Sequence, residues 1–257
     1  MNEPIPNPPN RRGFIRTTSA ATIATGLSQL PSVHAAGSET LRLGLIGCGG
    51  RGTGAADNAL KADPKVKIVA MADVFPDRMK KSADRLKHLH KERFAVEEDH
   101  RFIGFDSYQK LLASDVDVVI LATPPHFRPE HLQAVVAAGK HAFVEKPVAV
   151  DAVGARSVLE TCRQAKGKGL SIVSGLMLRY SLAVKETMKR IHDGAIGRIV
   201  TMQANYNIGG LWSHPRQDGW SDMDYQLRNW YYYTWLSGDH IVEQHVHGLD
   251  MMAWAMR

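Results

Sequence analysis

The sequence predicts a parallel α/β sheet covered by helices, followed by a second α/β domain with an open sheet. From Leu41 onward, short apolar runs alternate with longer amphipathic segments, which is the pattern of parallel strands joined by crossover helices. The first apolar run changes abruptly into glycines at Gly47. We expect the first domain over 38–175 and the second over 176–257. The second is expected to be truncated at its C-terminus, because one strand and two helices do not make the sheet of such a domain.

The expected strands are 41–46, 66–72, 117–121, 141–144 and 170–174, with a short strand near 101–105. The expected helices are 51–62, 76–91, 107–113, 127–138 and 152–166. Gly139 is well placed to end the fourth of these helices. The second domain is expected to begin with a helix over 181–192 and a strand over 197–206.

The glycine turn has the spacing G-x-G-x-x-G, between a predicted strand and a predicted helix. In a Rossmann-type dinucleotide site the first glycine permits a tight turn, the second lets the backbone approach a pyrophosphate, and the third lets the helix pack on the strand. An acid ends the next strand, 21 positions after the third glycine, where it would meet the adenosine ribose. The alternative is an ordinary strand–turn–helix connection without a nucleotide. The residues expected at the cofactor are Gly47, Gly49, Gly50, Arg51, Gly52 and Asp73.

Two further strand ends carry polar residues. Thr123, Pro124 and His126 follow one strand, and Glu145 and Lys146 follow the next. Ligands of open α/β sheets bind at the carboxyl ends of the strands, so we expect these residues beside the cofactor. A lysine on the surface is the ordinary alternative for Lys146.

The segment His240–Asp250 places His240, Glu243, His247 and Asp250 on one face, provided that it forms a helix. One interpretation makes His247 a general base, since imidazole has a suitable pKa, with Glu243 orienting it. A metal site and a polar face at a domain interface are the alternatives. The spacing alone fits all three.

The motifs GCGGRG, ATPPHFRPEHLQAVVAAGKHAFVEKPVAVD and GDHIVEQHVHGLD, together with Asp73, resemble the glucose–fructose oxidoreductase and inositol dehydrogenase family (Gfo/Idh/MocA). The resemblance runs from about Leu41 to the chain end. It implies oxidation or reduction of sugars, polyols and related alcohols with NAD or NADP. It also implies that Lys146 contacts the reacting hydroxyl and that Glu243 and His247 are catalytic, with no metal. Many members have aspartate at the position of Glu243.

The second half is rich in aromatic residues, among them Trp212. Such rings either face the C–H groups of a sugar or fill core and interface space. We expect Trp212 and Arg228 among the substrate-binding residues. The resemblance adds Arg179 and Tyr180, which follow the domain crossover.

Composition narrows the function classes. The chain has 257 residues, 44% of them hydrophobic, and a formal net charge of +6. Its basic residues are interspersed with acids, so no concentrated basic stripe points to nucleic acid. Two cysteines do not form a disulfide framework, and we expect both thiols free.

Residues 1–36 resemble a twin-arginine export signal. Arg11 and Arg12 precede Phe14 and Ile15, an alanine- and threonine-rich segment follows, and Val33–Ala35 resembles a cleavage site. The segment is too short and polar for a stable membrane span. We expect export to the periplasm or secretion, with the twin-arginine translocase as partner. The alternative is a disordered basic N-terminus.

Together these features predict an exported, homo-oligomeric oxidoreductase acting on a sugar or polyol. Asp73 favours NAD, since its carboxylate repels a 2′-phosphate, whereas Arg78 leaves NADP open. An NAD-dependent glycosidase that works by transient oxidation is one alternative. A catalytically incomplete fragment that binds nucleotide or sugar is the other.

Overall fold

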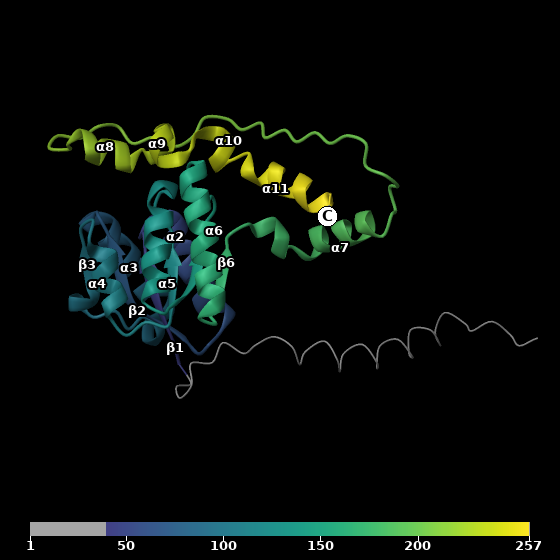
Figure 1. Cartoon of the computed structure of the whole chain (residues 1–257). Helices are drawn as coiled ribbons and strands as arrows, with labels where there is room; N and C mark the ends of the chain where they lie inside the picture. The colour runs from purple at the N-terminus through teal and green to yellow at the C-terminus, as the bar shows by residue number, and fades with distance from the viewer. Residues whose placement is uncertain (1–39, 257) are drawn as a thin grey trace, which may run out of the picture. The chain divides into compact units, whose positions relative to one another are not determined.

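The computed structural model describes residues 40–256. The export signal predicted over residues 1–36 lies outside this range and stays a prediction. Six strands form one sheet in the order β3-β2-β1-β4-β5-β6, and all five pairings are parallel (Figure 1). The strands are β1 (Leu41–Ile46), β2 (Val66–Asp73), β3 (Arg101–Ile103), β4 (Val118–Leu121), β5 (His141–Val144) and β6 (Ile172–Ser174).

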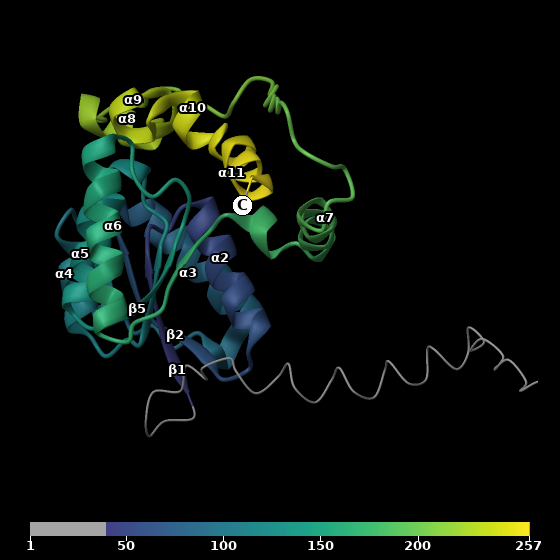
Figure 2. The same ribbon diagram turned by 45° about the vertical axis from the view of Figure 1, so that its right-hand side comes forward.

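Helices cover both faces of the sheet (Figure 2). On one side lie α2 (Gly50–Ala62) and α3 (Pro76–His90), and on the other α4 (Ser107–Ala113), α5 (Arg128–Ala137) and α6 (Ala152–Gly167). Each face has its own buried apolar cluster. Within β1, Leu45 belongs to one cluster and Ile46 to the other. Strands buried on both faces need apolar side chains throughout, which is why they read as continuous apolar runs.

The predicted parallel sheet is confirmed, and each expected element of this part lies within about two residues of its observed bounds. Gly139 follows α5 with a φ of 71°, a conformation that favours glycine. The order of the strands reverses between β1 and β4. Loops that leave these two strands diverge, and the crevice between them is where ligands of such sheets bind.

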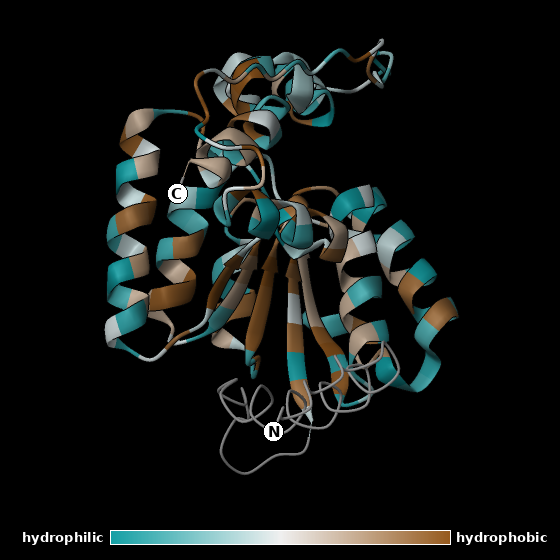
Figure 3. Ribbon diagram, turned by 90° about the vertical axis from the view of Figure 1, so that its right-hand side faces the viewer, coloured by the Kyte–Doolittle hydropathy of each residue, from teal (hydrophilic) through white to brown (hydrophobic). Residues whose placement is uncertain are grey.

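Beyond β6 the described chain is helical or irregular. Its helices are α7 (Leu182–His192), α8 (Asp222–Arg228), α9 (Thr234–Ser237), α10 (Asp239–Glu243) and α11 (Val246–Ala255). Several of them lie over the ends of the strands (Figure 3). Buried Leu227 and Leu236 pack there against Phe75, which follows β2.

The strand predicted over 197–206 is wrong. The segment is extended and Met202, Ala204 and Tyr206 alternate in burial with their exposed neighbours. Within residues 40–256, however, no neighbouring strand pairs with it, and a ladder needs a partner for its backbone groups. The open sheet of the second domain is therefore not formed in the described residues, and the domain boundary near 175 stays a prediction.

Candidate functional site

The glycine turn after β1 has the close contacts that its spacing predicts. Gly47 has a φ of 97°, and a Cβ there would lie 2.6–2.8 Å from backbone atoms of Ala122 and Thr123. A Cβ on Gly52 would lie 1.9 Å from the carbonyl oxygen of Gly47. Gly47 excludes a side chain because the backbone that follows β4 packs against it, and Gly52 does so because α2 begins against the turn.

Gly49 and Gly50 differ from these two glycines. A Cβ on either would meet no atom within 4 Å, and both residues line a pocket of about 1080 Å³. No side chain caps the N-terminus of α2, which starts at Gly50. Open space thus faces the positive end of a helix with uncapped N–H groups, an arrangement that suits a phosphate.

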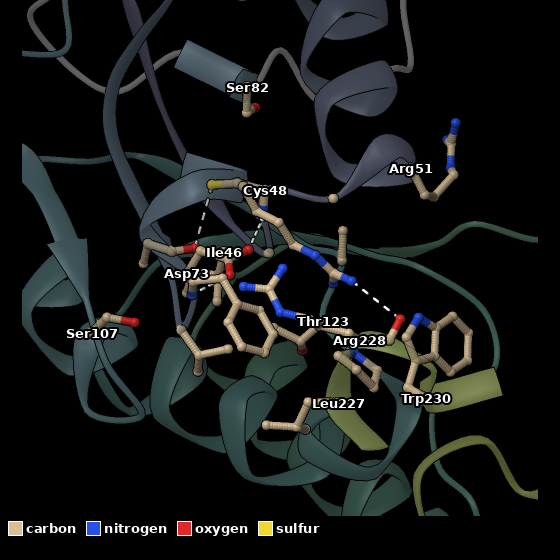
Figure 4. A pocket seen from close by; sticks show the side chains of 18 of the residues that line it. Ile46, Cys48, Arg51, Asp73, Ser82, Ser107, Thr123, Leu227, Arg228 and Trp230 are labelled. Atoms are coloured by element: carbon tan, nitrogen blue, oxygen red, sulfur yellow. Dashed lines mark hydrogen bonds between the residues drawn. The ribbon is translucent and has the colours of Figure 1, made fainter. Parts of the chain in front are cut away.

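Asp73 ends β2 at the same pocket and is held by two backbone donors (Figure 4). The N–H of Cys48 donates to its Oδ2 at 2.6 Å, and the N–H of Phe75 donates to its Oδ1 at 2.8 Å. Burial raises the pKa of the Asp73 carboxyl, and these two donors oppose that effect. The carboxylate is consequently fixed at the rim where the turn and β2 meet.

The loop after β4 contributes the opposite wall. Thr123 and Pro124 line the pocket, and Thr123 Oγ1 lies 3.3 Å from Nδ1 of His131. His126 packs edge-on against Trp235 instead, with ring centroids 5.1 Å apart. Of the three residues expected here, Thr123 and Pro124 therefore face the pocket, and His126 contacts the second part of the chain.

The second part of the chain also lines this pocket, which the sequence did not indicate. Arg228 and Trp212, expected at the substrate, lie here together with Leu227 and Trp230 (Figure 4). Arg228 pairs with Asp77 at the beginning of α3. These residues are far from the glycine turn in the sequence and meet it only in the folded chain. No sequence motif therefore links the two regions.

Glu145 links the pocket to a second group of polar side chains. Nε of Arg51, in the glycine turn, donates to Oε1 of buried Glu145 at 2.6 Å. The next residue, Lys146, directs its Nζ at Glu243, 2.6 Å from both Oε1 and the backbone oxygen. The hydroxyl of Tyr231 donates to the other carboxylate oxygen of Glu243 at 2.5 Å. Sequence reasoning missed Tyr231, one of several neighbouring aromatic residues.

His247 is 9% exposed, and the charges of Lys146 and Glu243 act on its imidazole. Burial lowers the pKa of its imidazole, and the charge of Lys146 lowers it further, while Glu243 acts in the opposite direction. Tyr206 stacks on the ring at 6.3 Å. A neutral imidazole beside an ammonium group can accept a proton, whereas imidazolium there is disfavoured.

The expectation of one helix over His240–Asp250 is wrong. The chain forms α10 and α11 with a break at Gln244 and His245. The N–H groups of both Gln244 and His245 donate to the carbonyl of His240, so the regular hydrogen-bond pattern is interrupted. Glu243 and His247 are buried on either side of the break. His245 instead contacts the backbone oxygen of Ala204 at 3.0 Å.

The remaining predicted substrate residues lie at another contact. Nε of Arg179 donates to both carboxylate oxygens of Asp250 at 2.8 and 2.9 Å. The guanidinium also lies over Trp254. Tyr180 is 55% exposed. Arg179 therefore ties the short helix after β6 to α11.

Arg128, at the beginning of α5, is a buried residue that sequence reasoning missed. Its Nη2 donates to the carbonyl of Thr123 at 2.7 Å, and its Nη1 donates to that of Pro147. Burial lowers its pKa to about 10, opposed by the charges of Glu145 and Glu243. One guanidinium thus joins the loops that carry the residues expected at the cofactor. Only its three-dimensional position distinguishes it from other arginines.

Within residues 40–256, no group of three or more His, Cys, Asp or Glu side chains is arranged to hold a metal ion. No helix in this range is long and apolar enough to cross a membrane. Cys48 and Cys162 are both free, as expected.

Two curated proteins illustrate what this chain is similar to. A glycosyl hydrolase family 109 protein of Streptomyces coelicolor is 31% identical over 183 residues, covering 70% of this chain and 37% of its own. The inositol 2-dehydrogenase of Rhizobium meliloti is 28% identical over 160 residues, covering 62% and 43%. The chain thus spans less than half the length of these two curated relatives.

The WlbA dehydrogenase of Chromobacterium violaceum, solved with NADH and UDP-GlcNAcA, has the same fold, with a TM-score of 0.62 and 21% identity. The match covers 86% of this chain and 56% of that one. The model of the oxidoreductase family with an NAD-binding Rossmann fold (Gfo/Idh/MocA) matches residues 41–172, which include the glycine turn, Asp73, Thr123 and Lys146. This chain belongs to that family.

Proposed function

We propose that the protein transfers a hydride between NAD(P) and a CH–OH group of a sugar or polyol. The observation that carries this proposal is the continuous path from the nucleotide pocket to a lysine whose side chain is 16% exposed. Arg51 of the glycine turn contacts Glu145, and the adjacent Lys146 contacts Glu243 beside His247. A hydroxyl bound at Lys146 would therefore be near a cofactor held by the turn.

The residues of the pocket fit NAD. The open space before Gly49 and Gly50 and the uncapped start of α2 suit the pyrophosphate. Asp73 stands where a carboxylate would accept from the ribose hydroxyls. Bound NAD(P) supplies the nicotinamide carbon that accepts or donates the hydride.

Lys146 and His247 have separate tasks in this proposal. The ammonium group of Lys146 holds the substrate oxygen and stabilises negative charge that develops on it. His247 is kept neutral by burial and by Lys146, so it takes the hydroxyl proton as the hydride leaves the carbon. Glu243 fixes the ammonium group through its carboxylate and its backbone carbonyl.

Mass spectrometry of the nucleotide released on denaturation tests the first half of the proposal. We expect NAD from the purified protein, or from protein incubated with NAD and NADP together and then desalted. Turnover is tested by NADH formation with a panel of polyols, sugars and nucleotide sugars. Protein that retains neither dinucleotide under both conditions would contradict the proposal.

A second candidate is an NAD-dependent glycosidase, favoured by the 31% identity to the glycosyl hydrolase family 109 protein. In that reaction a glycosidic bond breaks after transient oxidation of the sugar, and the cofactor is regenerated. Release of the leaving group from an aryl glycoside without net NADH would favour this candidate. NADH accumulation in step with substrate oxidation would exclude it.

We further propose export through the twin-arginine translocase, based on the order of charged, apolar and small residues in 1–36. A fusion of residues 1–36 to a folded reporter should reach the periplasm. Replacing Arg11 and Arg12 together by lysine should stop it. Export that persists in cells without the translocase would contradict this proposal.

A further inference from the structure

The segment 212–230, which we call the covering segment, reaches from the second part of the chain to the beginning of α3. Arg228 connects the segment to Asp77 in the first turn of α3. Nη1 and Nη2 donate to the two carboxylate oxygens of Asp77 at 2.9 and 2.7 Å. A guanidinium that donates to both oxygens of one carboxylate has fixed geometry as well as charge.

Aromatic rings hold the same guanidinium. Its central carbon lies 3.9 Å from the ring centroid of Phe75 and 4.6 Å from that of Trp220. The Arg228 side chain is only 14% exposed. Contacts of a cation with aromatic faces strengthen as water is excluded. The Asp77 side chain is 61% exposed, so the covered half of this ion pair is the guanidinium.

The backbone and the neighbouring residue add to this contact. Arg78 donates from Nη2 to the carbonyl oxygen of Arg228 at 3.2 Å. Leu227 is buried against Phe75. Leu227 and Arg228, at the end of α8, therefore attach the covering segment to the residues that follow Asp73, through side-chain and backbone contacts.

These contacts lie at the adenosine end of the proposed cofactor site. Arg228 and Leu227 lie across the pocket from Asp73 (Figure 4), and Trp220 and Gly49 line the same pocket. Moreover, Nε of Arg228 is buried and has no hydrogen-bond partner among the described residues, and the charge of Asp73 acts on this arginine.

We propose that the covering segment closes the adenosine end of the pocket and that the Arg228–Asp77 pair controls nucleotide exchange. This inference rests on the proposed binding of NAD(P). Nucleotide can leave only when the segment separates from the beginning of α3. Loss of the pair increases the fraction of open molecules, so both variants that break it should release nucleotide faster by the same factor.

Stopped-flow displacement of NADH by excess NAD measures this rate. We expect Arg228→Ala and Asp77→Ala each to accelerate release about 10- to 100-fold, the range for loss of one charge-assisted, two-point contact. The double variant should resemble the singles, since the two residues act through one contact. The matched control is Arg216→Ala. Arg216 lies on the same segment but pairs with exposed Asp222, and its loss should leave the rate unchanged.

The charge-reversed variant, Asp77→Arg with Arg228→Asp, keeps the test independent of folding defects. Slow release restored in it supports the proposal. Fast release from Arg228→Ala alone, with Asp77→Ala unchanged, would mean that Arg228 binds the nucleotide directly and would overturn control by the pair. Unchanged release in both would also overturn it. A wild-type protein that binds no NADH contradicts the proposed function instead, which separates the two failures.

Discussion

The Nζ of Lys146 lies 2.6 Å from the Oε1 of Glu243 and 2.6 Å from its backbone oxygen, although the residues are 97 positions apart. The lysine side chain is 16% exposed and the glutamate 7%. An ammonium group has three N–H donors. With two directed at Glu243, we expect the third to be available to the substrate hydroxyl that we propose to bind there.

Lys146→Ala and His247→Ala should each lower kcat by about two to four powers of ten, the usual range for groups that transfer or stabilise a proton. Nucleotide binding should survive in both, measured by NADH fluorescence titration, because neither residue lines the pocket. The double variant should be little worse than the poorer single one, since both act on one step.

His245→Ala is the matched control. His245 lies in the break between α10 and α11, and its ring contacts the Ala204 carbonyl, so the variant should keep most activity. If His245→Ala lowers kcat strongly and His247→Ala lowers it only slightly, the assignment of His247 as the base is wrong.

Tyr231→Phe should lower the free energy of unfolding by about 1–3 kcal/mol, because it leaves the buried Oε2 of Glu243 without its donor. Urea denaturation measures the loss. Tyr232→Phe is the control: its hydroxyl donates to the Leu211 carbonyl from a residue that is 54% exposed, where water can replace it. Equal losses in the two variants would mean that Glu243 does not depend on Tyr231.

Gly49→Val should abolish nucleotide binding and leave the fold intact, because its Cβ would point into open space within the pocket. Gly52→Ala should instead destabilise the fold. Its Cβ would lie 1.9 Å from the Gly47 carbonyl oxygen and would prevent α2 from packing on the turn. Thermal denaturation and isothermal calorimetry with NAD distinguish the two. If folded Gly49→Val binds NAD with undiminished affinity, the pyrophosphate does not bind at this turn.

Asp73→Ala should weaken NAD and raise the ratio of NADP to NAD affinity, because the carboxylate that repels a 2′-phosphate is gone. The variant should also lose stability, since the N–H groups of Cys48 and Phe75 lose their acceptor. Calorimetric titration with both nucleotides checks the ratio. An unchanged preference would show that Asp73 has no contact with the ribose.

The buried imidazole of His131 should make the stability of the protein depend on pH. Burial lowers its pKa to about 4, against about 6.5 in an unfolded chain. Between these values the unfolded state binds more protons, so stability falls as the pH drops from 6.5 toward 4, by about 3 kcal/mol in all. Urea midpoints from pH 7 to pH 4 should show this slope, and His131→Gln should reduce it. His88→Gln, exposed on α3, should not alter it.

The sheet and the glycine turn could be predicted because their signals are local. Apolar runs and the spacing of Gly47, Gly49 and Gly52 follow from constraints within about thirty residues. The second part could not be predicted in the same way. The alternation around Ala204 is real, but a strand depends on a neighbour that sequence periodicity does not reveal.

The candidate site was predicted in part for the same reason. Strand ends indicated Thr123 and Lys146, and the resemblance to a family indicated Glu243 and His247. Tyr231, Arg128 and the position of Arg228 depend on contacts between segments far apart in the chain. Their chemistry, a hydroxyl or a guanidinium, is common on any surface and becomes distinctive only when buried.

Cys48 makes the glycine turn accessible to direct measurement. Its thiol is buried beside the Ala72 carbonyl and the Met79 sulfur, and burial raises its pKa well above the usual value. A thiol in this state does not react with alkylating reagents. Its alkylation therefore requires the turn to open, and the labelling rate, compared with that of half-buried Cys162, reports how often the turn opens in the native protein.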